Sequence, residues 1–338
     1  MIVLLHPGIL ALISGSALAF AMVLYASGVA LKILRRWNPQ SSSEEQLLLE
    51  RKTYLVSTIV NYALGFTVLA TLLFLFTIED IHRLFVGAMC ATGTLNANPV
   101  GWTALLIKII LFFVAALWVA VNLLDQRTED TPLVRIKYGA LLLIAPLMGG
   151  DLYLQTVYFL GLEPQIITSC CGSLFNVGGE GFASELAALP VPTMLKVFYP
   201  AAFLYLAGAG ACLWSPATCL RYGVAALAVI FFVISLAAVV SFISLYIYQM
   251  PTHHCPFDML QRYYYFVGYP LYAGLFLGTL FGLLPGLCQP LKNRSASLCR
   301  EIMRMEKSWL LLSMFFMTLF LMIASWPLLF GNFRMFGY

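Results

Sequence analysis

The run Gly101–Leu124, GWTALLIKIILFFVAALWVAVNLL, decides the fold of this chain. It holds one charged residue, Lys108, and is otherwise almost entirely apolar. A helix of about 20 mainly apolar residues crosses the hydrocarbon core of a bilayer, so this run is long enough to span a membrane. Of all 338 residues, 61% are hydrophobic and only 10% are charged. Soluble domains carry about 25% charged residues, so lipid is the expected solvent for most of this chain.

Seven further runs share this character, and together they predict an all-α, polytopic membrane helix bundle. Helices satisfy their own backbone hydrogen bonds in lipid, and the chain has too few alternating runs for a membrane β-barrel. We expect one transmembrane domain covering residues 1–338. The eight predicted spans are residues 8–33, 54–77, 101–124, 134–160, 194–214, 220–248, 263–287 and 308–330.

The basic residues predict the orientation of these spans. Of the 19 Lys and Arg residues, fourteen fall in or beside one set of links and four in or beside the other, with Lys108 inside a span. Cytoplasmic links carry the excess of Lys and Arg, so both termini are predicted on the outer side. The predicted cytoplasmic links are 34–53, 125–133, 215–219 and 288–307, and the predicted outer links are 78–100, 161–193 and 249–262.

The composition also limits the partners and the location. The net charge is only +4, and the basic residues form no stripe that would suit a nucleic acid, so no nucleic-acid partner is expected. The expected partners are the lipid bilayer, a soluble thioredoxin-like protein, or other membrane subunits. An integral protein of the bacterial cytoplasmic (inner) membrane is the predicted location.

The predicted outer links hold a set of thiols and imidazoles. The set comprises Cys90, Cys170, Cys171, His253, His254 and Cys255. Four cysteines allow three complete pairings, and an oxidising compartment favours disulfides. Three interpretations stay open here: redox-active thiols, purely structural disulfides, and a metal site.

The third outer link contains the sharpest local pattern, Pro251–Asp258, PTHHCPFD. Its Cys-Pro-Phe portion resembles the start of the Cys-Pro-Phe-Cys redox motif of thioredoxin-like proteins, with Asp258 where the second cysteine would stand. A redox partner for Cys255 must therefore come from another link. Charged imidazoles nearby would stabilise a thiolate, and the thiolate is the nucleophile. His253, His254 and Cys255 could equally bind zinc or copper.

Two charges are predicted inside the bilayer. Lys108 lies about eight residues from the outer end of its span, and Asp151 about nine residues from the outer end of the next, so their depths roughly agree. Opposite charges at one depth could pair and lower each other's desolvation cost. A proton relay, an ion path, a polar anchor for a quinone head group, and a structural ion pair are all compatible with this pattern.

The first functional hypothesis is a membrane thiol-redox or electron-transfer protein, which as an enzyme would be a thiol-disulfide oxidoreductase. It would exchange disulfides or electrons with a soluble partner or a membrane quinone. The residues expected to carry this chemistry are Cys255, Cys170, Cys171, Cys90, Lys108 and Asp151. The alternatives are a transporter or permease subunit for a soft metal ion or another small solute, and a structural subunit of a larger membrane complex.

Overall fold

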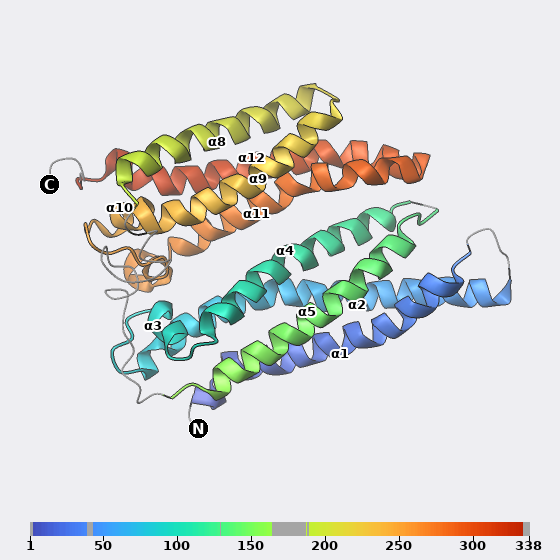
Figure 1. Cartoon of the computed structure of the whole chain (residues 1–338), viewed down its shortest axis with the longest axis horizontal. Helices are drawn as coiled ribbons and strands as arrows, with labels where there is room; N and C mark the ends of the chain where they lie inside the picture. The colour runs from blue at the N-terminus through green and yellow to red at the C-terminus, as the bar shows by residue number, and fades with distance from the viewer. Residues whose placement is uncertain (1–2, 39–42, 129, 164–186, 188, 334–338) are drawn as a thin grey trace. The chain divides into compact units, whose positions relative to one another are not determined.

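The computed structural model describes residues 3–38, 43–128, 130–163, 187 and 189–333. Every regular element within these residues is helical (Figure 1). Eight helices are long and apolar enough to cross a membrane, which indicates an integral membrane protein in a lipid bilayer. They are Pro7–Arg36, Glu44–Leu84, Gly101–Asp125, Val134–Leu160, Val191–Trp214, Thr218–Tyr248, Gly268–Arg294 and Ala296–Phe330. The all-helical prediction with eight candidate spans is confirmed.

The contacts divide the chain into two compact units. Unit 1 comprises Met1–Leu84, Leu95–Gln165 and Leu291–Glu301. Unit 2 comprises Phe85–Thr94, Ile166–Pro290 and Ile302–Tyr338. The expectation of one transmembrane domain for the whole chain stays a prediction.

Unit 1 is built from four long helices, α1 (Pro7–Arg36), α2 (Glu44–Asp80), α4 (Gly101–Asp125) and α5 (Val134–Leu160). Helix α1 packs against α2 and α5, and α4 packs against the same two helices (Figure 1). The larger buried side chains between them are Trp37, Leu64, Leu111, Trp118, Tyr138 and Met148. The interior of unit 1 is thus a four-helix core with apolar side chains from each helix.

Helix α2 begins well before its apolar run. Ser43 is its N-cap, and the Ser43 hydroxyl accepts a hydrogen bond from the backbone N–H of Gln46 at 3.3 Å. Such a cap satisfies one of the N–H groups that have no partner inside the helix. The polar start of α2 therefore needs no lipid to be helical, and the helix extends ten residues before the predicted span at 54.

Unit 2 is also built from four long helices, α8 (Val191–Trp214), α9 (Thr218–Ala238), α11 (Gly268–Cys288) and α12 (Ala296–Phe330), whose first residues belong to unit 1. Helix α9 packs against both α8 and α11. Three aromatic rings from α8, α9 and α12 meet in its interior, because Phe198, Phe231 and Phe320 lie within 6.2 Å of one another by ring centroid.

Helix α11 packs through a row of glycines. Gly274, Gly278, Gly282 and Gly286 recur every four residues and so share one face of the helix. A Cβ added at any of them would lie 2.3–2.9 Å from a neighbouring atom. The neighbours belong to α8, α9 and α12, so small residues let these helices approach closely.

Short elements occupy one end of unit 2, where α9 continues into a π-helical turn, η3 (Val239–Ile243), and then α10 (Ser244–Tyr248). The seventh predicted span, 263–287, begins too early. Helix α11 starts at Gly268, because Tyr265 and Phe266 have left-handed φ angles of 55° and 57°, which interrupt a right-handed helix. The remaining short elements are η1 (Val3–Leu5), η2 (Ile81–Leu84), α3 (Ala91–Asn96), η4 (Asp258–Leu260), η5 (Arg262–Tyr264) and η6 (Gln289–Arg294).

Candidate functional site

Two of the predicted site cysteines come together in unit 2. Cys90 directly precedes α3, and Cys255 lies between α10 and η4. Their sulfur atoms are 3.4 Å apart although the residues are 165 positions apart in sequence. Both side chains are completely buried. The fold thus creates a buried pair of thiols from two separate links.

The backbone around Cys255 is held by two tyrosines. The Tyr248 hydroxyl donates to the carbonyl of Cys255 at 2.7 Å and accepts from the N–H of Met259 at 2.9 Å. The Tyr272 hydroxyl donates to the carbonyl of Pro256 at 2.6 Å. Because three backbone groups of this short link are bonded to side chains of the helices on either side, the position of the Cys255 sulfur is well defined.

The π-helical turn supplies a contact for His254. The carbonyl of Val240, inside η3, accepts a hydrogen bond from Nδ1 of His254 at 2.9 Å. A carbonyl can only accept, so Nδ1 carries the proton. Burial lowers the pKa of His254, which favours the neutral imidazole. The turn, a kind often found at functional sites, thereby anchors the histidine that precedes Cys255.

Asp258 connects the thiol pair to a more exposed group. The Cys255 thiol donates to Oδ1 of Asp258 at 3.4 Å, while Nε2 of His253 contacts Oδ2 of the same carboxylate. The His253 side chain is 27% exposed, against 11% for Asp258. A chain of contacts therefore leads from a buried sulfur to a partly exposed imidazole.

Two further groups contact the Cys255 sulfur. The backbone N–H of Phe257 donates to it at 3.4 Å, and the Thr92 hydroxyl lies 3.5 Å from it. The Cys255 sulfur thus has the Phe257 N–H as a hydrogen-bond donor and Asp258 Oδ1 as an acceptor for its own proton.

The same groups could hold a metal ion. One ligand atom each from Cys90, Cys255 and Asp258 lies within 4.8 Å of the other two, and all three residues are buried. Two thiolates and a carboxylate suit zinc, and soft thiolates also suit copper. His253 would then act on the carboxylate ligand and orient it. His254 is not part of this cluster in the described part of the chain, so its predicted role as a ligand stays a prediction.

Lys108 and Asp151 lie in unit 1. The Lys108 ammonium and the Asp151 carboxylate are 3.0 Å apart, and the two side chains are 3% and 7% exposed. The Thr71 hydroxyl donates to the backbone carbonyl of Lys108 at 3.2 Å. The pair thus links α4 to α5 within the apolar interior. A proton relay, an ion path or a quinone anchor at this pair stays a prediction.

Several residues of the two regions were not predicted from the sequence. In the sequence Asp258 stands out only as a departure from a cysteine motif, although its position three residues after Cys255 would allow the contact. A second buried pair, Asp125 with Lys137 at 2.7 Å, also joins α4 to α5. Lys137 is counted in the sequence as a basic residue beside a cytoplasmic link, and only its place at the start of an apolar run hints at burial.

Cys170 and Cys171 lie outside the described residues, so their predicted part in the site stays a prediction. Comparison with protein-family models, curated proteins and solved structures finds no match to this chain. A function for it therefore rests on the chemistry of its own side chains.

Proposed function

We propose that this chain is a membrane thiol-redox protein in which Cys90 and Cys255 alternate between a dithiol and a disulfide. The observation that supports this proposal is the 3.4 Å separation of two sulfur atoms that come from distant links. Thiols at this separation need only small movements to form a bond. Free cysteines are often inert packing groups, but here the hydrogen-bonded carboxylate beside the pair offers a route for protons.

The reaction balances with a quinone as the electron acceptor. Two S–H bonds break and one S–S bond forms, which releases two electrons and two protons. The quinone takes both electrons and takes up two protons from water to become a quinol, while the two thiol protons are released to water. Asp258 accepts the proton of Cys255, and His253 passes it to water. Cys255 is the nucleophilic sulfur, because the N–H of Phe257 stabilises its thiolate.

The burial of both sulfurs favours a small acceptor. Thiol-disulfide exchange needs the attacking sulfur to reach the sulfur under attack, and a soluble thioredoxin-like protein would have to open the site first. A quinone is dissolved in the same bilayer as the helices. The alternative electron acceptor is the disulfide of a soluble protein that oxidises the pair directly. The experiment below distinguishes the two acceptors.

The experiment follows the two thiols in the full chain held in lipid nanodiscs. The reduced protein is mixed with a short-chain benzoquinone, and the remaining thiols are alkylated and assigned by mass spectrometry. We expect Cys90 and Cys255 to be protected together as one quinol forms per chain. Cys90→Ser and Cys255→Ser should each abolish quinol formation, whereas Cys219→Ser, which changes an exposed cysteine elsewhere in unit 2, should not.

The pH dependence adds a second readout. Asp258→Asn removes the proton acceptor, so quinol formation should slow and shift to higher pH, where the thiol loses its proton to water instead. Oxidation by a thioredoxin-like disulfide but not by the quinone would identify the soluble partner as the acceptor. If both thiols remain reduced with every oxidant, the redox proposal is wrong.

A metal site is the second candidate, and the gathering of three ligand atoms within 4.8 Å favours it. Here the pair would bind zinc or copper, as in a permease subunit for a soft metal. Protein purified without chelator in the presence of a reductant would contain about one metal ion per chain. Cys255→Ser and Asp258→Ala should both lower that content, whereas the redox reaction predicts no bound metal.

We infer that the thiol pair faces the outer side of a bacterial inner membrane, with both termini on that side. The uneven distribution of basic residues supports this orientation. A single cysteine added at the C-terminus of a variant with its own cysteines changed to Ser should react with an impermeant maleimide on intact cells. Labelling only after the membrane is opened would reverse the assigned orientation.

A further inference from the structure

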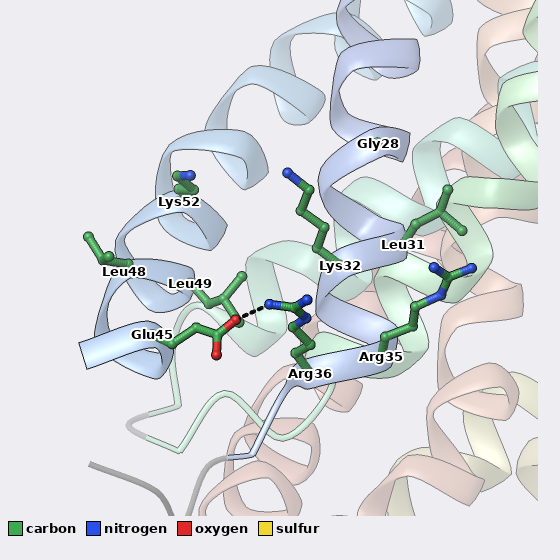
Figure 2. Close-up of a pocket in the computed structure, with 9 residues that line it drawn as sticks. All are labelled: Gly28, Leu31, Lys32, Arg35, Arg36, Glu45, Leu48, Leu49 and Lys52. Atoms are coloured by element: carbon green, nitrogen blue, oxygen red, sulfur yellow. Dashed lines mark hydrogen bonds and ion pairs between the residues drawn. The ribbon is translucent and has the colours of Figure 1, made fainter. Parts of the chain in front are cut away.

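Unit 1 contains a cavity of about 590 Å³ between the last turns of α1 and the first turns of α2. Four basic side chains line it, three from α1 and one from α2: Lys32, Arg35, Arg36 and Lys52. Figure 2 shows Lys32 extending from α1 towards α2, and the contact between Arg36 and Glu45 crossing the same space. The two helices thus bring positive charge to one concave surface.

The charge in this cavity is largely uncompensated. Glu45 is the only carboxylate among the lining residues, and it forms an ion pair with Arg36. Within the described parts of the chain, Lys32, Arg35 and Lys52 form no ion pair. The lining therefore has a formal excess of three positive charges, and like charges this close favour the binding of an anion.

The cavity lies at the expected depth of a lipid head group. Helix α1 has 30 residues and is about 45 Å long, whereas the hydrocarbon core of a bilayer is about 30 Å thick. The apolar run of α1 ends directly before Lys32, which is the first Lys, Arg, Asp or Glu of the chain. The last turn of α1 therefore extends beyond the hydrocarbon core, where phosphate groups lie.

The lining also includes an apolar part beside the charges. Leu31 and Leu48 line the cavity and are 47% and 49% exposed, so acyl chains could cover them. Gly28, one turn before Lys32, leaves open space, because a Cβ added there would meet no atom within 4 Å. The cavity thus combines room, cationic groups and an adjoining apolar surface, which is the amphipathic pattern of a phospholipid.

We propose that this cavity binds the phosphate head group of an anionic phospholipid. Lys32, Arg35 and Lys52 contact the phosphate, and the acyl chains run along Leu31 and Leu48. Basic cavities between membrane helices on the cytoplasmic side suit such head groups, and the distribution of basic residues predicts that side for this end of α1. The site is independent of the thiol pair, which belongs to unit 2.

The test is native mass spectrometry of the full chain in detergent, titrated with phosphatidylglycerol, cardiolipin or phosphatidylcholine. Each basic residue near an anionic lipid is worth about fivefold in affinity, so Lys32→Gln with Lys52→Gln should weaken phosphatidylglycerol binding by about 25-fold. The control, Arg51→Gln with Arg127→Gln, removes two charges that do not line the cavity. It should change the affinity for phosphatidylglycerol by less than about threefold.

Two variants test the site without removing a cation. Gly28→Leu fills the open space and should weaken the binding of anionic lipids while the protein keeps its fold. Glu45→Gln releases Arg36 and should raise the affinity for anionic lipids by up to about fivefold. This gain cannot arise from misfolding, and the exposed ion pair it removes contributes little to stability.

The source of the phosphate is decided by competition. Phosphatidylglycerol that remains bound in millimolar inorganic phosphate supports a lipid site. Displacement by inorganic phosphate at those concentrations would instead mark a site for a free anion and overturn the proposal. Equal binding of phosphatidylcholine, or equal losses in the cavity and control variants, would overturn it as well.

Discussion

Unit 1 and unit 2 join their helices by partly different chemistry. In unit 1, α4 and α5 are connected by two buried lysine–aspartate pairs, Lys108 with Asp151 and Asp125 with Lys137. The sense of the pairs is opposite, because α4 supplies the cation of one and the anion of the other. In unit 2, α11 instead presents its row of four glycines to its neighbours.

The difference shows two solutions to one problem. Lipid tails are as apolar as leucine, so helices in a bilayer gain little from the hydrophobic effect when they associate. A charged side chain is costly in lipid and therefore pairs strongly with an opposite charge on a neighbouring helix. Such a pair also selects one register between the two antiparallel helices. Glycines let two backbones approach and gain dispersion contacts. Unit 1 uses the first solution. Unit 2 uses the second along α11 and also has one buried ion pair, Arg221 with Glu306, between α9 and α12.

Breaking one buried pair in unit 1 should give the largest effect. Lys108→Met leaves the Asp151 carboxylate buried without its cation and should lower the free energy of unfolding by about 3–5 kcal/mol. Denaturation in mixed micelles measures the change. Lys108→Met with Asp151→Leu should recover most of the loss, because an apolar pair needs no partner. A loss below about 1 kcal/mol in the single variant would show that this pair does not hold α4 to α5.

Adding one methyl group to the glycine row of unit 2 should give an intermediate effect. In Gly278→Ala the new Cβ would lie 2.7 Å from the Met317 Cγ and 3.1 Å from its backbone nitrogen. Such crowding should cost about 1–3 kcal/mol in the same denaturation measurement. The control is Gly223→Ala on α9, where a Cβ meets no atom within 4 Å, and which should be neutral or stabilising by up to about 1 kcal/mol. Equal effects of the two variants would contradict the role given to the row.

Acidification should give the smallest effect, and it should arise in unit 2. His254 is buried with its pKa lowered, whereas an unfolded histidine has a pKa of about 6.5. Below that pH the unfolded chain takes up the proton first, so stability is full above pH 6.5 and falls on the acid side. His254→Gln keeps a donor for the Val240 carbonyl and should flatten this dependence between pH 7 and pH 5. Parallel melting-temperature curves for the two proteins would exclude this explanation.

The eight helices could be predicted from the sequence because hydropathy is a local property. Each span is one continuous segment, and its length is set by the bilayer rather than by the rest of the protein. The helix ends were predicted less well, because hydropathy marks only the apolar part of each helix. Helix α2 begins at Glu44, ten residues before its apolar run, because a cap at Ser43 suffices to start it in a polar environment.

The candidate site could be predicted only in part. Cys255 and the neighbouring histidines stood out as a local pattern, but the sequence offered three cysteines as the partner of Cys255. The contact between Cys90 and Cys255 depends on how two links approach each other in unit 2. The contact of Asp258 with the Cys255 thiol arises in the same way, and the role of proton acceptor that we propose for Asp258 depends on that contact.

Amino-acid order was therefore sufficient for the eight candidate spans and their approximate limits, since each follows from hydropathy along one chain segment. Folding selected the pairs: which lysine meets which aspartate, which sulfur meets Cys255, and which basic residues share a cavity. These contacts join residues tens of positions apart or more, or distinct helices, and their geometry arises from packing that no local pattern encodes.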